Sequence, residues 1–237
     1  GFDGVGWTTT NYRWSRAIDW HRDDEADDKT DSLLRRVENV ARNFALLPYR
    51  VFFQILTAGS DAALLPAIPN APDGAALFSA TDGAGAARFG VTGGNIVTGS
   101  GVANEAQVIS DFYNALERIL SFQDTEGEQL YDEAYIRAQG LVVVYGVGHH
   151  ERFSRALKGE NATVVIQNVA GAENVAAAAT VNPISKAGFR VDLLPSAKIT
   201  DNDWSLWVRD PVVPTVYRQV REDLELLHED ESNSPAS

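Results

Sequence analysis

The sequence predicts an α+β fold. Three observations support this prediction: amphipathic helical patterns dominate the first half, short strand-like segments separated by Asn, Pro and Gly fill the second half, and a glycine- and alanine-rich stretch divides the helices. A chain of 237 residues can bury one large core or the cores of two modest subdomains. No apolar run reaches the roughly 20 residues that a membrane-spanning helix needs, so we expect no membrane partner.

The first 22 residues are typical of an extended arm. They open with glycines and then alternate, so that aromatic side chains share one face of a strand-like segment and charged side chains the other. Such an arm cannot bury its own aromatic rings, and we expect them to pack in a groove of the chain or on a neighbouring subunit. The candidate intersubunit contact residues are Trp7, Tyr12, Arg13, Trp14, Ile18, Trp20 and Arg22.

An acidic segment, "DWHRDDEADDKTD" at 19–31, follows the arm and raises the question of a metal site. A calcium-binding EF-hand loop needs Gly at its sixth position and Glu at its twelfth. Counted from Asp23, these positions hold Asp28 and Leu34, so the spacing fails. Carboxylates ahead of a helix N-terminus are favoured by the helix dipole. We therefore interpret the segment as a solvated acidic turn that leads into a helix.

Two helices are predicted next. The first has Thr30 or Asp31 as N-cap and ends before Pro48, and the second runs from Pro48 to Gly59. Three- and four-residue steps between apolar positions predict one buried face on the first helix. The residues of this face are Leu33, Leu34, Val37, Val40, Ala41 and Phe44.

Residues 60–101 are predicted to form a long loop with short extended pieces. Such a loop is typical of a protein that makes contacts between subunits. Its "TGSG" lacks the third glycine of a dinucleotide turn, and no phosphate-loop lysine is present. A third helix is predicted at about 104–122, capped by Asn104 with Gln107 three residues on. Its buried stripe comprises Ile109, Phe112, Tyr113, Leu116, Ile119 and Leu120.

In the second half we predict a buried strand, "GLVVVYG", followed by a short helix, "HHERFSRALKG". Four more strands are predicted after it: "TVVIQN", "FRVDLLP", "DWSLWVRD" and "VYRQVRE". Trp204 and Trp207 lie three apart and cannot share one face of a regular strand, so we expect a bulge or turn there. His149, His150 and Glu151 are adjacent on a helix and cannot jointly bind one ion. The acidic tail from Glu222 to Ser237 is expected to fray.

The composition excludes several functions. The chain has no Cys, which rules out disulfides, zinc-thiolate sites and thiol nucleophiles. No Ser–His–Asp order, paired buried carboxylates or metal cluster emerges, so we expect a protein that is not an enzyme, with no catalytic residue, cofactor or metal. Acidic residues number 33 against 20 basic ones, of which only four are lysine. We find no basic stripe for nucleic acid. The balance fits either an ordinary soluble acidic protein or adaptation to high salt, where acid-rich, lysine-poor surfaces keep a protein soluble.

The order of these features resembles the major head subunits of tailed phages, in particular the Mu-like type with the Hong Kong 97-type capsid fold. The segments that carry the resemblance are "YRWSRAIDWHRDDEADDKTDSL", "DGAALFS", "GGNIVTGSG", "LSFQDTEGEQL", "GLVVVYGVGHHERFSRALKG" and "DNDWSLWVRD". The order in which they follow one another extends over nearly the whole chain. One departure is that the family often has a histidine after "LFS", where this chain has "ATDGAG".

The resemblance implies four regions: an extended loop at 1–29, a peripheral domain with a spine helix at 30–129, an axial domain at 130–205, and a return strand with an acidic tail at 206–237. It implies a major capsid protein whose pentamers and hexamers form the icosahedral shell around a double-stranded DNA genome. The implied partners are other copies of the chain, DNA bound without sequence specificity, and decoration, portal or scaffold proteins. The implied location is the virion, with assembly in the host cytoplasm.

Two alternatives stay open at this point. An encapsulin-like nanocompartment shell shares the fold but encloses protein cargo. An acidic α/β enzyme with an unrecognised site belongs to a different class, and activity as a monomer would favour it.

Overall fold

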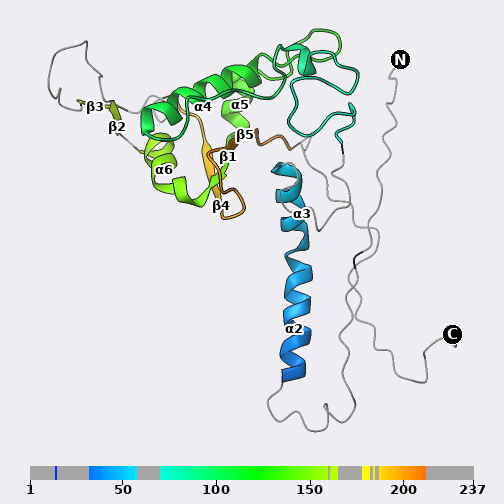
Figure 1. Cartoon of the computed structure of the whole chain (residues 1–237). Helices are drawn as coiled ribbons and strands as arrows, with labels where there is room; N and C mark the ends of the chain where they lie inside the picture. Colours follow the sequence, from blue (N-terminus) through cyan, green and yellow to red (C-terminus); the bar gives the residue numbers. More distant parts are fainter. Residues whose placement is uncertain are drawn as a thin grey trace.

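The computed structural model describes residue 14 and residues 32–57, 70–159, 161–164, 178–181, 184 and 187–211. Within these ranges the chain has the predicted α+β fold, with helices around a small sheet (Figure 1). The helices are α2 (Ser32–Ala45), α3 (Leu47–Leu56), α4 (Glu105–Leu120), α5 (Glu133–Gln139) and α6 (His150–Lys158), with short 3-10 turns η1 (Arg88–Gly90) and η2 (Val147–His149). The strands are β1 (Leu141–Gly146), β2 (Asn161–Val164), β3 (Ala178–Val181), β4 (Val191–Ser196) and β5 (Trp204–Val208).

The main sheet has three strands in the order β4-β1-β5, with β1 parallel to β4 and antiparallel to β5. Its central strand β1 is buried along almost its whole length, which explains why it reads as a continuous apolar run. The predicted strands "GLVVVYG", "FRVDLLP" and "DWSLWVRD" are confirmed. β2 and β3 form a separate antiparallel pair. The predicted strand "TVVIQN" begins inside β2 and its remainder lies outside the described residues, whereas β3 was not predicted. The predicted strand "VYRQVRE" lies outside the described residues.

The predicted bulge in β5 is wrong. The pairing of β5 with β1 runs without interruption from Leu141↔Val208 to Tyr145↔Trp204. The two tryptophans lie on opposite faces of the sheet, and each finds apolar partners there. The Trp204 ring packs 5.7 Å from the ring of Phe153. On the other face, the Trp207 ring lies 5.9 Å from that of Phe78 and 6.2 Å from that of Phe52. A regular strand can therefore hold both indoles.

The larger core lies between the sheet and the helices α4 and α6 (Figure 1). As predicted, Asn104 caps α4: its Oδ1 accepts the Gln107 backbone N–H at 3.0 Å, and Gln107 Oε1 accepts the N–H of Ala103 at 3.1 Å. The core joins residues on both sides of position 129, and the division into peripheral and axial domains stays a prediction. The fully or nearly fully buried side chains include Val108, Phe112, Leu116, Ile136, Leu141, Val143, Tyr145, Phe153 and Ile184.

A smaller core on the opposite face of the sheet attaches α3 to the rest of the molecule. Phe53 and Leu56, in the second half of α3, pack with Val144 of β1 and with Ile199. The hydroxyl of Tyr49 adds a hydrogen bond of 3.0 Å to Ser196 Oγ at the end of β4. α3 is thus fixed to the sheet in both its first and its second half.

One short helix was missed from the sequence. α5 has only seven residues, too few to show an apolar period, but the side chain of Asp132 caps it by accepting the N–H of Tyr135 at 2.6 Å. Ile136 is the one buried side chain of α5. The detectable signal was Asp132 followed by Glu133, a helix start in a stretch for which no element was predicted.

Alkaline pH is expected to destabilise the fold. Burial raises the pKa of Tyr145 and of Tyr113 above the ordinary 10.0, and burial together with the charge of Asp210 raises that of Tyr131. The folded chain therefore holds these phenolic protons more tightly than the unfolded chain. The resulting stability is complete below about pH 10 and is lost as pH rises through the raised values. Urea midpoints measured from about pH 8 to 11 should fall above about pH 10, and less steeply in Tyr145→Phe. A midpoint that stays constant over this range would contradict the expectation.

Among the described residues, no helix combines the length and the apolar character needed to cross a bilayer.

Candidate assembly surface

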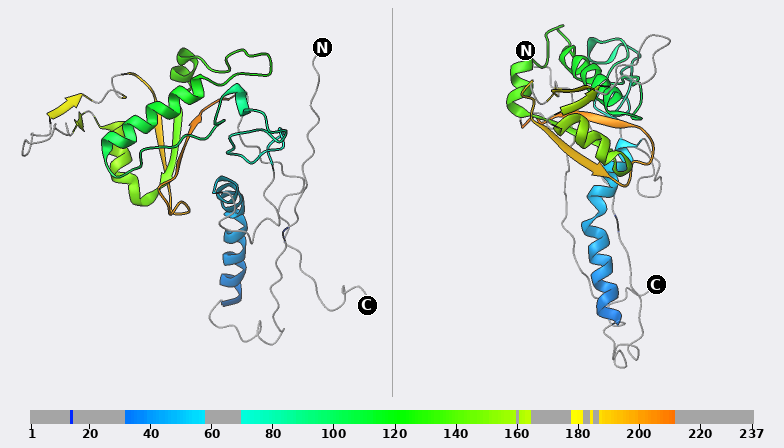
Figure 2. Two further views of the ribbon diagram at one scale, coloured as in Figure 1. Left: turned by 45° about the horizontal axis from the view of Figure 1, so that its top comes forward. Right: turned by 90° about the vertical axis from the view of Figure 1, so that its left-hand side faces the viewer.

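Helix α2 projects away from the sheet and its covering helices as the outer part of a rod that continues into α3 (Figure 2). None of its described side chains is buried. Leu34 is 60 % exposed, and Val37, Val40 and Phe44 are only half-buried. The sequence predicted that this apolar face is buried, and the structure corrects this: the helix forms, but the described chain does not cover it. The physical reason is that α2 extends beyond the sheet to which α3 is attached.

The apolar stripe continues through the junction of the two helices. Backbone hydrogen bonds bridge it, from Leu46 N to Arg42 O at 3.2 Å and from Arg50 N to Leu46 O at 3.1 Å, so Pro48 interrupts the helix without ending the rod. We define the apolar stripe as Val37, Val40, Phe44, Leu47 and Val51. Their spacing of three and four residues is that of a helix seam that packs against another element.

The rod also carries arginines away from the apolar stripe, and we call them the basic face: Arg35, Arg36, Arg42 and Arg50. Arg35 and Arg42 lie opposite the stripe, whereas Arg36, four residues before Val40, lies at its edge. α2 and α3 hold these four arginines and a single carboxylate, Glu38. Because an α-helix turns about 100° per residue, arginines that look scattered in the sequence gather on one side. No basic run is visible in the sequence, and the grouping of these arginines emerges only with the helical period.

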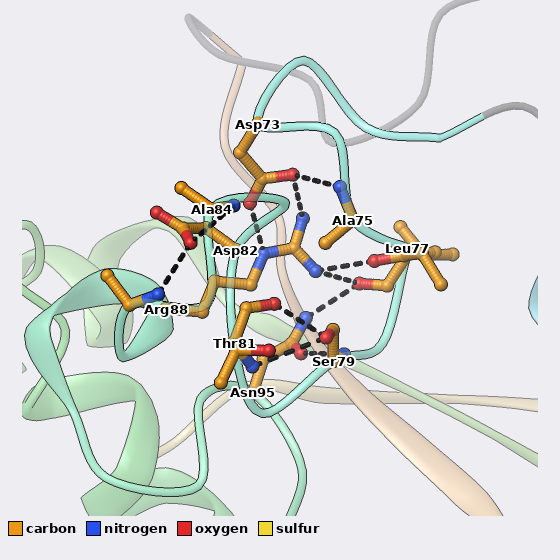
Figure 3. A network of polar contacts seen from close by, with 11 residues as sticks. Asp73, Ala75, Leu77, Ser79, Thr81, Asp82, Ala84, Arg88 and Asn95 are labelled. Carbon is orange, nitrogen blue, oxygen red and sulfur yellow. Dashed lines mark hydrogen bonds and ion pairs between the residues drawn. The ribbon is translucent and has the colours of Figure 1, made fainter.

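The glycine-rich loop at 70–103 is held together by a buried arginine (Figure 3). Arg88, 6 % exposed, donates from Nη1 to the carbonyls of Ala76 and Leu77 at 2.7 and 2.8 Å. Its Nε lies 2.6 Å from Asp73 Oδ2 in an ion pair. Asn95 contributes a second cross-link, because its side chain accepts the N–H of Ser79 at 2.8 Å and donates to Leu77 O at 2.8 Å. The loop is thus ordered by its own side chains rather than by regular secondary structure.

A second buried group fastens the end of this loop to α4. Asp111, 2 % exposed, accepts the backbone N–H groups of Ser100 at 2.8 Å and Gly101 at 3.2 Å, and the hydroxyl of Ser100 at 2.9 Å. Gly99 is required here, because a Cβ atom at this position would lie 2.5 Å from Asp111 Oδ2. Gly94 is required for the same reason, since its Cβ would lie 2.2 Å from the Ser79 carbonyl oxygen.

Asp111→Asn is expected to destabilise the loop by about 1.5–3 kcal/mol, because an amide has one acceptor oxygen where the carboxylate has two. The hydrogen exchange of the Ser100 and Gly101 amides should accelerate and the urea midpoint should fall. The matched control is Asp124→Asn, since Asp124 also accepts two backbone N–H groups, of Glu126 and Glu128, but in an exposed turn. Equal losses in the two variants would show that the buried position of Asp111 is unimportant.

The predicted contact residues of the arm are described at one position. Trp14 is 39 % exposed. Trp7, Tyr12, Arg13, Ile18, Trp20 and Arg22 lie outside the described residues, as do the acidic segment 19–31 and the tail 222–237. The role of the arm in contacts stays a prediction.

Of the two histidines that precede and begin α6, the exposed His150 contacts the core through Tyr145. His150 Nδ1 lies 2.6 Å from the buried hydroxyl of Tyr145, and the two rings are stacked. His149 is partly buried. Within the described ranges, no three His, Asp or Glu side chains gather as metal ligands.

Comparisons of the chain with protein-family models, with curated proteins and with solved structures found no match.

Proposed function

We propose that this chain is a structural shell protein: the major capsid subunit of a tailed virus, with the Hong Kong 97-type fold, that assembles through pentamers and hexamers into a closed icosahedral shell around double-stranded DNA. The observation that carries the proposal is the apolar stripe of α2 and α3. It has the spacing of a packing seam but lies on a rod that the described chain leaves half-exposed.

The stripe supports assembly for an energetic reason. Burying an apolar side chain of the size of Val, Leu or Phe contributes about 1.5–3 kcal/mol. An amphipathic helix that projects into water forgoes most of this gain, and a neighbouring copy that covers the stripe restores it. In a closed shell each copy makes the same contact, so the gain is repeated at every interface.

Contacts in the rest of the described chain limit the movement of the elements next to the apolar stripe. α3 is attached to the sheet by Phe53 and Leu56, and the loop at 70–103 is cross-linked by Arg88 and fastened by Asp111. Rigid attachment lowers the entropy lost when subunits associate. The predicted aromatic arm at 1–29 would supply a second contact on the neighbouring subunit.

Multi-angle light scattering of the purified full chain tests the proposal. We expect uniform particles of many subunits to form as the protein concentration rises, across a range of salt conditions. A chain that stays monomeric in every condition tested would overturn the proposed function.

Shells of this protein are expected to tighten with salt and to loosen on dilution. Between Asp19 and Asp31 there are seven carboxylates against Arg22 and Lys29, and the segment from Glu222 to Glu231 adds six more with no Lys or Arg. Copies on neighbouring subunits repel one another when the Debye length is about 30 Å at 0.01 M salt, but not when it is about 3 Å at 1 M. This behaviour would fit a virus of a salt-loving host. Electron microscopy of particles dialysed from molar to millimolar salt gives the measurement, and equal integrity at both ends would refute this salt dependence.

A further inference from the structure

The basic face of the α2–α3 rod stands out because three of its four arginines have no ion-pair partner among the described residues. Within the described residues, Arg35, Arg36 and Arg42 are exposed and make no ion pair. Arg50 is half-buried and donates to Asn43 Oδ1 at 3.2 Å. Elsewhere in the described chain most arginines are engaged. Arg88, Arg137, Arg155 and Arg209 pair with carboxylates, and Arg118 and Arg152 donate to backbone carbonyls.

We propose that the basic face contacts the phosphate backbone of double-stranded DNA, without reading its sequence. The inference rests on the proposed function, which places a concentrated polyanion inside the shell. The subunit as a whole carries a net charge of −13 and repels DNA, so a favourable contact requires a local group of positive side chains such as the basic face.

The chemistry and the geometry of the face fit this partner. Guanidinium groups bind phosphate oxygens in pairs of hydrogen bonds, and α2 and α3 contain arginine but no lysine. From Arg35 to Arg50 the rod rises about 22 Å at about 1.5 Å per residue, a length that spans several phosphates along a duplex. The amides of Asn39 and Asn43 lie on the same side of the helix, between the arginines, and can donate further hydrogen bonds.

Arg35 and Arg42 lie across the helix from the apolar stripe, and Arg36 lies at its edge. One side can therefore pack on a neighbouring subunit while the other stays open to DNA. With at most four phosphates neutralised per chain, the contact is weak and strongly salt-dependent. Such a contact lets DNA move along the inner surface while the shell fills.

The test compares two triple variants of the full chain, held below the concentration at which it assembles. The first is Arg35→Gln with Arg36→Gln and Arg42→Gln. The control is Arg137→Gln with Arg155→Gln and Arg209→Gln, which removes the same charge from exposed, carboxylate-paired arginines. The probe is a fluorescently labelled 30-base-pair duplex of random sequence, and the readout is its anisotropy from 20 to 300 mM salt.

For the wild type we expect affinity to fall with salt at a slope of about −0.9 per phosphate contacted. The basic-face variant should lose roughly tenfold in affinity at low salt and two to three units of slope, and the control should keep the wild-type slope. Equal losses in both variants would overturn the inference, because net charge alone would then explain binding.

Light scattering of the same variants at high concentration measures assembly separately from DNA binding. Lost assembly with unchanged DNA binding would assign the basic face to an acidic segment of another copy and overturn the DNA contact. A wild type that binds DNA in this way but never assembles would overturn the proposed function instead.

Discussion

Val40→Glu combined with Phe44→Glu is expected to abolish particle formation while leaving the subunit folded. Both side chains are half-buried members of the apolar stripe on α2. Two carboxylates placed in a packing seam would remove the apolar gain and add a desolvation cost, together about 3 kcal/mol or more at each interface. Since no described side chain of α2 is buried, the sheet and its cores should be unaffected. Light scattering measures assembly, and circular dichroism checks the fold.

The matched control adds the same two charges to the same helix away from the stripe. Asn39→Glu with Ala45→Glu changes two positions that are both exposed. We expect this variant to assemble with at most a modest loss. If Val40→Glu with Phe44→Glu assembled normally, the apolar stripe would not be part of the interface. If its circular dichroism signal collapsed, α2 would belong to the core of the subunit.

Phe153→Ala is expected to cost the largest amount of folding stability, about 3–5 kcal/mol. The ring of Phe153 is fully buried on α6, 4.3 Å from that of Tyr145 and 5.7 Å from that of Trp204. It therefore joins α6 to the central strand β1 and to the edge strand β5. Urea denaturation of the unassembled subunit, followed by circular dichroism, should show a much lower midpoint.

Leu194→Ala provides the control for this substitution. Leu194 lies on β4 of the same sheet but is 46 % exposed, so its truncation should change stability by no more than about 0.5 kcal/mol. A loss of under about 1 kcal/mol in Phe153→Ala would contradict a core centred on α6 and the sheet.

The regular elements were predictable because their signals are local. The cap at Asn104, the apolar run of β1 and the proline at 48 each identify an element from a few neighbouring residues. α5 was missed because a seven-residue helix is too short for a period to emerge. The false bulge in β5 shows the opposite limit. The sequence could not reveal that apolar groups cover both faces of the sheet, so that Trp204 and Trp207 need not share one.

The surface features depended on information that the sequence does not carry locally. The amphipathic pattern of α2 was visible, but whether its apolar side is covered depends on where the sheet ends relative to the rod. The buried roles of Arg88 and Asp111 depend on loop geometry, because their partners lie 10 to 15 residues away in the sequence. Neither Arg88 nor Asp111 had a recognisable role in the sequence, although the two side chains organise the interior of the loop.

Cryo-electron microscopy of the purified full chain at high salt tests the central claim most directly. We predict closed icosahedral shells of pentamers and hexamers, in which a neighbouring subunit covers Val40 and Phe44 of α2. Uniform monomers, or particles in which this stripe faces solvent, would contradict the account.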